Sequence, residues 1–334
     1  MKKGICCAGN IIADISYPIE RYPRAGELTH IFEGIGRSTG GSVCNTVTDL
    51  ARLAPEMRLT ASGIVGKDSE GDFVMAELGR YPNVDCSHIR RQGRTSFTAV
   101  MNDRQTHERT FFQYAGANAV YGEEHIDWDG LDADIFHIGY ILLLPHLDEP
   151  DAEYGTKMAR LLHTARQHGF KTSIDVVTEA GDRFARLVPP ALRYTDYCVI
   201  NELEAQQTTG VCLRDESGTL RRENLPSALR RLRELGVARW AVIHCPELGC
   251  GMAEDGQYAE LASLRLPEGY IKGTVGAGDA FCAGVLCAAE QGQTLRQALK
   301  LGACAAAASL SHPSASEGVG TAEEVLALYD RYGG

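Results

Sequence analysis

The chain has 334 residues and a formal net charge of −11, from 33 Lys plus Arg against 44 Asp plus Glu. This acidic balance argues against a nucleic-acid-binding protein, which needs a basic face. The 11 cysteines include no Cys-x-x-Cys pair, which disfavours a zinc or redox motif, and so many free thiols are typical of a reducing cytosol. No apolar run approaches the ~20 residues of a membrane span, and the first apolar run is too short for a signal peptide. We therefore expect a cytoplasmic protein with no nucleic-acid or membrane partner.

Short apolar runs alternate with helical patterns along most of the chain. The predicted strands, in chain order, are residues 4–9, 58–65, 134–139, 171–176, 196–200 and 239–244. The predicted helices are residues 43–54, 69–79, 151–168, 202–209 and 224–235, followed by an apolar helix that begins at about 276. This alternation is typical of a three-layer α/β/α fold, in which helices cover both faces of a mostly parallel central sheet.

One segment breaks the alternation. Two β-rich runs, residues 95–102 and 108–114, are joined by a short polar loop and predict a hairpin. Together with the β-leaning stretches 12–17 and 30–36, the segment 95–115 would form a small second sheet. Because ligand sites in α/β proteins lie at the carboxyl ends of the strands, this sheet is either a lid over such a site or an edge hairpin without a role. We expect one domain over residues 1–334 with this small sheet as an appendage.

A glycine-rich turn, Gly276-Ala277-Gly278-Asp279, opens the apolar helix near the C-terminus. The helix is apolar nearly all round, so we expect it to be buried, with first-turn N–H groups that need an anion, a cap or water. The small residues let a phosphate approach the backbone. Asp279 is either a cap of this helix or a base that accepts a proton from a substrate hydroxyl during phosphoryl transfer.

Two other glycine-rich readings fit worse. The run from Gly36 to Ser42 has the glycine spacing of a P-loop but lacks the lysine that reaches the phosphates. A dinucleotide fingerprint would need a third glycine where Phe281 stands, which disfavours a nicotinamide-dependent dehydrogenase.

The C-terminal motif resembles that of the ribokinase family, also called the PfkB carbohydrate kinases, and the resemblance runs from Gly9 to about Gly320. It implies a ribokinase-like fold, use of ATP with Mg²⁺, and a β-sheet lid. By resemblance, Asp279 is the catalytic base. The backbone of Gly276, Ala277 and Gly278 would form the anion hole.

Further motifs match the family in chain order. Asp14 resembles the aspartate that holds sugar hydroxyls, and Gly40-Gly41 with Asn45 resembles the signature that lines the sugar site. Asn201 and Glu204 match the Asn-x-x-Glu motif that organises magnesium and phosphate, and no residue is assigned as a direct metal ligand. Taken alone, Asp14 is equally a turn residue, and Asn201 equally a cap of the helix 202–209.

The segments expected to lie near the nucleotide depart from the family pattern. Gly273 and Val275 stand where the family has aspartate and threonine, which leaves potassium activation open. His244 and Thr274 are still expected beside ATP, but Pro246 removes a backbone N–H from that segment.

The resemblance implies transfer of the ATP γ-phosphate to a hydroxymethyl group of a ribose- or fructose-like sugar. A nucleoside kinase of the same fold, or a sugar- or nucleotide-binding regulator without turnover, stays an alternative. Basic residues gather in the expected lid; if some, such as Arg109, point inward, the acceptor could carry an acid group. These residues are Arg90, Arg91, Arg94, Arg104, His107 and Arg109. Family members often pair through the lid, which implies a homodimer.

Overall fold

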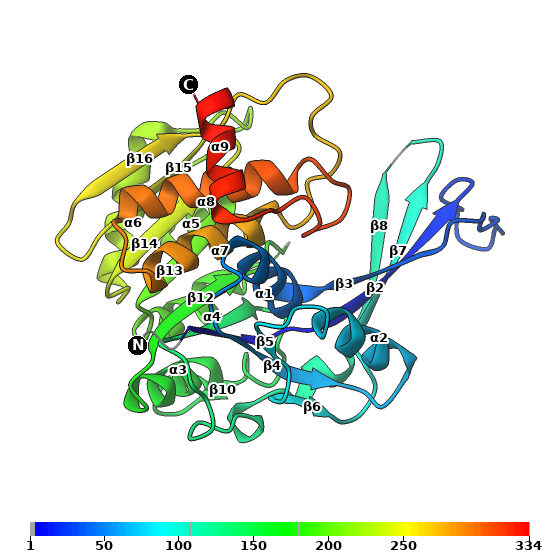
Figure 1. Cartoon of the computed structure of the whole chain (residues 1–334), viewed down its shortest axis with the longest axis horizontal. Coiled ribbons are helices and arrows are strands. Elements are labelled where there is room, and N and C mark those ends of the chain that lie inside the picture. Colours follow the sequence, from blue (N-terminus) through cyan, green and yellow to red (C-terminus); the bar gives the residue numbers. More distant parts are fainter. Residues whose placement is uncertain (1–3, 107, 180, 334) are drawn as a thin grey trace.

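The structure is a computed structural model that describes residues 4–106, 108–179 and 181–333. Its central sheet is parallel except at one edge, where β15 and β16 run antiparallel (Figure 1). The strand order is β16 (Tyr258–Ala262), β15 (Leu248–Met252), β14 (Trp240–His244), β13 (Tyr197–Asn201), β12 (Lys171–Val176), β9 (Ile135–Ile141), β1 (Ile5–Gly9), β4 (Leu59–Val65) and β5 (Val84–Asp85), with β6 (Ile89–Arg91) also paired to β4.

Helices cover both faces of this sheet and bury two apolar clusters. Neighbouring residues of β1 point to opposite clusters: Cys7 lies in one, and Cys6 and Ala8 lie in the other. The first cluster is covered by α1 (Gly41–Leu53), α2 (Ser69–Leu78), α7 (Ala277–Glu290), α8 (Leu295–Ser309) and α9 (Ala322–Tyr332). The second is covered by α3 (Lys157–Gln167), α4 (Phe184–Leu192), α5 (Glu202–Thr209) and α6 (Leu225–Glu234). The three-layer prediction is therefore confirmed.

A separate small sheet projects from this body (Figure 1). Its order is β3 (Gly36–Gly40), β2 (Ile12–Ile19), β7 (Phe97–Asp103) and β8 (Arg109–Tyr114), and only β2 and β7 run parallel. We call it the lid sheet. The stretch 30–36 is not the strand that the sequence predicted: Ile31 forms a single bridge with Ile19, and the strand begins at Gly36. Gly34, with φ of +96°, lies between the two.

The predicted helix 151–168 begins later than expected. The side chain of Asp151 accepts the N–H groups of Glu153 and Tyr154 and closes a turn in a two-strand ribbon, β10 (Pro150–Asp151) with β11 (Gly155–Thr156). The side chain of Thr156 then caps α3 by accepting the Ala159 N–H. The turn closed by Asp151 and the cap formed by Thr156 therefore explain why α3 begins at Lys157 and not at residue 151.

Several elements were not predicted from the sequence: α4, α8, α9 and the antiparallel strands β15 and β16. α4 contains Pro189 and Pro190, which argue against a helix in a sequence reading. Among the described residues, no helix is long and apolar enough to cross a membrane.

Candidate active site

Asp279 lies in the first turn of α7, where its carboxylate is held by two side chains from distant parts of the chain. The amide nitrogen of Asn45 donates to one carboxylate oxygen at 2.9 Å, and the hydroxyl of Tyr140 donates to the other at 2.7 Å. No side chain caps this helix start, which is at Gly276. Of the two readings of Asp279, the structure therefore does not support the cap.

The ionisation of Asp279 is set by opposing effects. Burial raises the pKa of its carboxyl to about 6, and the hydrogen bonds from Tyr140 and Asn45 lower it. The carboxylate is thus mostly ionised at neutral pH, in a site that is 7% exposed. Such a group can accept a proton from a hydroxyl brought next to it.

The backbone before Asp279 fits closely against the loop after α8. Gly276 has φ of +81°, and a Cβ there would lie 2.6 Å from the Cβ and the carbonyl oxygen of Ala315. A Cβ on Gly273 would likewise lie 2.9 Å from Pro313 Cα. Close packing therefore explains both glycines. Within the expected anion hole, the Ala277 N–H already makes a long 3.4 Å bond to the carbonyl of Thr274.

An acidic cavity of about 240 Å³ opens beside Asp279. It is lined by Tyr140, Asp175, Val176, Val177, Thr178, Asn201, Glu204, His244, Gly278 and Asp279. Asn201 and Glu204 form a reciprocal capping box at the start of α5. Burial raises the pKa of Glu204 to about 7, while bonds from the Asn201 backbone and from Thr178 lower it. Asn201 therefore caps the helix and also lines the cavity, and its role toward magnesium and phosphate stays a prediction.

A larger, mainly apolar cavity of about 600 Å³ adjoins the acidic one and shares Asn201, His244 and Gly278 with it. Thr274 and Pro246 also line it, and the expected place of His244 and Thr274 beside ATP stays a prediction. The His244 ring packs on Phe281 at 4.9 Å between centroids. Burial lowers the pKa of His244 to about 4, so its ring is neutral. Apolar walls with a few polar groups suit a flat heteroaromatic ring.

Asp14 lies on β2 beside the glycine pair that ends β3 and begins α1. A Cβ on Gly40 would lie 2.2 Å from an Asp14 carboxylate oxygen, and a Cβ on Gly41 would lie 2.5 Å from the Asn10 carbonyl oxygen. Position 41, with φ of +83°, therefore needs glycine, whereas a Cβ at position 40 would push the Asp14 carboxylate aside. Burial raises the pKa of Asp14, and a bond with Thr98 lowers it. α1 begins at this glycine pair and contains Asn45, which bonds to Asp279. The structure therefore brings the motif expected to line the sugar site next to the proposed base.

Arg109 lies apart from the other predicted site residues. It pairs with Asn102 at the outer end of the lid hairpin, whereas Tyr114 pairs with Phe97 at the inner end. Arg109 and Tyr114 are five residue steps apart along the strand, or about 17 Å.

The other basic residues of the lid region have partners of their own. Arg91 binds Asp72 and the Gly66 carbonyl, and Arg90 binds the His125 carbonyl. The guanidinium groups of Arg94 and Arg104 lie over aromatic rings: Phe97 and Tyr114 for the first, Phe32 for the second. His107 lies outside the described residues.

Three site residues were missed in the sequence. Tyr140 and Thr178 have no motif of their own, and Asp175 is part of the strand 171–176. A positional rule could have found two of them. Tyr140 directly follows the predicted strand 134–139 and Asp175 is near the end of the next, where the sites of parallel sheets lie. Burial raises the pKa of Asp175 well above its ordinary value.

A buried carboxylate at a glycine-rich helix start, between an apolar cavity and a lid, is an arrangement that suits phosphoryl transfer. A family model described as pfkB family carbohydrate kinase matches residues 2–322. The chain therefore belongs to the pfkB family of carbohydrate kinases, and the resemblance drawn from its motifs is confirmed. Ribokinase from Arabidopsis thaliana is 23% identical over 329 residues, which cover 96% of this chain and 79% of that protein.

Solved structures agree with this family. Arabidopsis thaliana ribokinase complexed with ribose and ATP gives a TM-score of 0.81 at 20% identity, covering 98% of this chain and 99% of that chain. A nucleoside kinase from Methanocaldococcus jannaschii gives 0.74 at 16% identity, covering 99% of each chain. At such identities the likeness shows the fold, which is ribokinase-like as predicted.

Proposed function

We propose that the protein is an ATP-dependent kinase that transfers the γ-phosphate to a hydroxymethyl group of a neutral, ribose- or fructose-like sugar. The observation that carries this proposal is the buried carboxylate of Asp279, held by Asn45 and Tyr140 at the start of α7. Its pKa of about 6 leaves it ionised at neutral pH, as a proton acceptor must be.

In the proposed reaction, Asp279 accepts the proton of the acceptor hydroxyl as its oxygen attacks the γ-phosphorus. The bond from that phosphorus to the oxygen of the leaving ADP breaks in line with the attack. Backbone N–H groups in the segment Gly276–Gly278 would donate to the phosphoryl oxygens, aided by the positive end of the helix dipole. The adenine would occupy the apolar cavity next to His244 and Thr274.

The residues of the acidic cavity fit a magnesium ion that arrives with the nucleotide. Burial raises the pKa values of Asp175, Glu204 and Asp279, and a cation would offset this crowding of carboxyl groups. Within the described ranges, no group of three or more His, Cys, Asp or Glu residues is arranged to hold a metal. Mg²⁺ often keeps several waters and binds through substrate phosphates. Asn201 and Glu204 would be the residues that hold it, and it would neutralise charge on the phosphates.

The acceptor side supports a neutral polyol. Asp14 offers a half-buried carboxylate for hydroxyl groups. An anionic acceptor would need an arginine or lysine that reaches it, and no arginine or lysine is among the described residues that line the two cavities next to Asp279. The proposal therefore favours a sugar without an acid group.

The test of the mechanism is the change Asp279→Asn. We expect turnover to fall about 10²- to 10⁴-fold, since the amide cannot take the proton, while ATP still raises the thermal stability of the variant. Asp196→Asn is a matched control, because Asp196 is also a buried carboxyl but bonds to Thr172 before β13, away from the cavities. Turnover by Asp279→Asn close to that of the unmodified protein would refute the assignment.

The acceptor is tested by ATP consumption over a panel of sugars, anionic sugars and nucleosides. We expect a neutral pentose or ketohexose to give the highest kcat/KM. A nucleoside as the best acceptor would establish the alternative nucleoside kinase. Binding of sugar and ATP with no turnover on any compound would establish the regulator.

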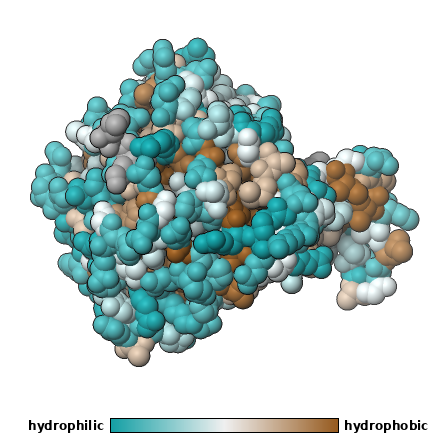
Figure 2. Space-filling view, turned by 60° about the horizontal axis from the view of Figure 1, so that its bottom comes forward, coloured by the Kyte–Doolittle hydropathy of each residue, from teal (hydrophilic) through white to brown (hydrophobic). Residues whose placement is uncertain are grey.

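We also propose a cytoplasmic homodimer that pairs through the lid sheet. All 11 cysteines are free thiols, which fits a reducing compartment. Large apolar side chains are exposed on and around the lid sheet, among them Ile35 and Phe111, each 59% exposed. Figure 2 shows hydrophobic side chains gathered on the projecting part of the molecule. An exposed apolar patch of this kind is typical of an interface.

A further inference from the structure

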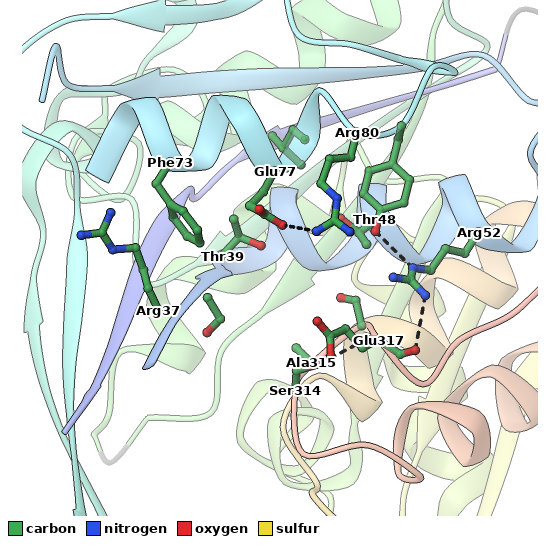
Figure 3. A pocket seen from close by; sticks show the side chains of 14 residues that line it. Arg37, Thr39, Thr48, Arg52, Phe73, Glu77, Arg80, Ser314, Ala315 and Glu317 are labelled. Atoms are coloured by element: carbon green, nitrogen blue, oxygen red, sulfur yellow. Dashed lines mark hydrogen bonds and ion pairs between the residues drawn. The ribbon is translucent and has the colours of Figure 1, made fainter. Parts of the chain in front are cut away.

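A polar cavity of about 290 Å³ lies between β3, α1, the end of α2 and the loop 314–317 (Figure 3). We call it the β3–α2 pocket. Asp14 of β2 pairs with Ser38, whereas Thr39 and Arg37 pair with Ala13 and Ile15. Side chains alternate along a strand, so Thr39 and Arg37 lie on the face of the lid sheet opposite Asp14, whereas Ser38, which also lines the pocket, shares the face of Asp14. The pocket shares no lining residue with the two cavities next to Asp279.

The side chains that line this pocket include more positive than negative charges. Three arginines, Arg37, Arg52 and Arg80, face two glutamates. Glu77 already pairs with Arg80 at 2.8 Å, so Arg37 and Arg52 face one remaining glutamate of the lining, Glu317.

Arg52 has neutral hydrogen-bond partners within the described part of the chain. Its Nε donates to the Tyr81 hydroxyl at 3.1 Å, and its Nη1 donates at 3.3 Å to the backbone carbonyls of Glu317 and Val319. Asp49, buried one turn earlier on α1, attracts it, but burial raises the pKa of Asp49 well above its ordinary value and favours the neutral acid. The guanidinium of Arg52 therefore keeps a charge that an anion could pair with.

The shape and donors of the pocket indicate the class of ligand. Figure 3 shows the side chains of Arg52 and Arg80 reaching the same end of the pocket. Hydroxyl groups of Thr39, Thr48 and Ser316 belong to the same lining. Guanidinium forks with nearby hydroxyls match the oxygens of a phosphate group. Ligand pockets usually start at about 300 Å³, so the occupant must be small.

The pocket touches the elements that build the candidate active site. Thr39 precedes Gly40, which packs on Asp14. Thr48 lies one turn after Asn45 on α1, and Asn45 holds Asp279. Ala315 packs on Gly276 of the expected anion hole. A ligand that prefers one arrangement of the loop 314–317 would thus change the nucleotide affinity, and the nucleotide would change the ligand's affinity by the same factor.

We propose that the β3–α2 pocket is a second ligand site, separate from the active site, that binds the phosphate group of a small molecule and is coupled to nucleotide binding. Inorganic phosphate and a small phosphate ester share this chemistry. The proposal does not rest on the kinase activity, because binding is measured without turnover.

The test is titration calorimetry of the protein with inorganic phosphate and, separately, with glycerol 3-phosphate, each with and without a non-hydrolysable ATP analogue. We expect Arg52→Gln and Arg80→Gln to weaken binding at least about tenfold, since each removes a charge-assisted contact. Arg80 is an exposed residue, so its variant should fold even if Arg52→Gln does not. Glu77→Gln should tighten binding because it removes a negative charge from the pocket.

Arg230→Gln is the control, because Arg230 is an exposed arginine on α6, outside the pocket. Binding of phosphate alone would identify the free ion as the ligand, and binding of the ester alone would identify a phosphorylated metabolite. The proposal of a site is overturned if neither compound binds, or if both arginine variants bind as the control does. A nucleotide affinity that is the same with and without the bound compound would overturn the coupling.

Discussion

The hydroxyl of Tyr140 reaches the same carboxylate as Asn45, from the other side. The two donors favour the charged form of Asp279, whereas burial favours the neutral acid. The balance decides at which pH the proposed base is ionised. Because activity needs the carboxylate form, the rate should rise with pH through the pKa of about 6 and then level off.

Removal of the Tyr140 hydroxyl tests this balance. In Tyr140→Phe the pKa of Asp279 rises, since a hydrogen bond that lowers it is lost. We expect the acid limb of the kcat/KM profile to move up by about one pH unit, with most of the activity recovered at high pH. The measurement is kcat/KM against pH for the unmodified protein and the variant.

A matched control is Tyr121→Phe, which removes a fully buried tyrosine hydroxyl that is bonded to Ser62 instead. The acid limb of its kcat/KM profile should stay at the same pH as in the unmodified protein. If the acid limb of Tyr140→Phe also stays at that pH, the hydroxyl has no effect on the proposed base.

At the scale of single elements, the turn between β3 and α1 places two glycines directly against two polar residues. Gly40 leaves space for the Asp14 carboxylate, and Gly41 leaves space for Asn10. The conformation of this turn therefore sets the place of Asp14 relative to α1.

Gly40→Ala should raise the KM for the acceptor about tenfold or more. The new Cβ would lie 2.2 Å from an Asp14 carboxylate oxygen and would displace that carboxylate. The KM for ATP should change little, since the nucleotide cavity lies elsewhere. Gly36→Ala on the same strand is the control, as its Cβ would meet Ser16 at an ordinary 3.7 Å. Equal acceptor KM values for the two variants would contradict the role given to Asp14. Steady-state kinetics with each substrate varied in turn provides the comparison.

An element could be predicted from the sequence where its own residues carry a strong pattern. Strand 171–176 and helix 202–209 have the predicted bounds, since each has a strong apolar pattern or a capping box. β3 was misplaced because Gly36–Gly40 has little β propensity and is a strand only through its pairing with β2. Tertiary pairing of this kind has no local signature in the sequence.

The same distinction applies to the site. Asn45 and Asn201 were singled out because their motifs resemble those of the family, and the structure places the first beside Asp279 and the second in the acidic cavity. Tyr140 could not be given a role, because its bond to Asp279 spans 139 positions of sequence. Nor did the sequence show that Asn45 holds Asp279, which depends on how α1 packs on α7.

At the scale of the whole molecule, exposed large apolar side chains gather on β8 of the lid sheet and in the loop between β2 and β3. Phe111 and Phe112 are 59% and 50% exposed, although they lie on opposite faces of β8. A monomer would leave both faces of that strand open to water, so we expect a second copy to cover it.

Phe111→Lys should shift the protein from dimer to monomer, because a charge placed in an apolar interface remains unpaired. Sedimentation velocity at micromolar concentration would measure the change. Val120→Lys adds the same charge at an apolar residue, 48% exposed, outside the lid strands, and should leave the dimer intact. A monomeric unmodified protein would contradict the proposed interface.

The bond between Asn45 and Asp279 joins positions 234 apart, so the two ends of the chain must meet before the carboxylate has its partners. During synthesis on the ribosome, the nascent chain exposes Asn45, the glycine pair and the lid long before α7 emerges. Contacts of such separation form late in folding. A truncated or half-folded chain would therefore lack the bonded carboxylate of the proposed base, and the proposed reaction would be limited to the finished molecule.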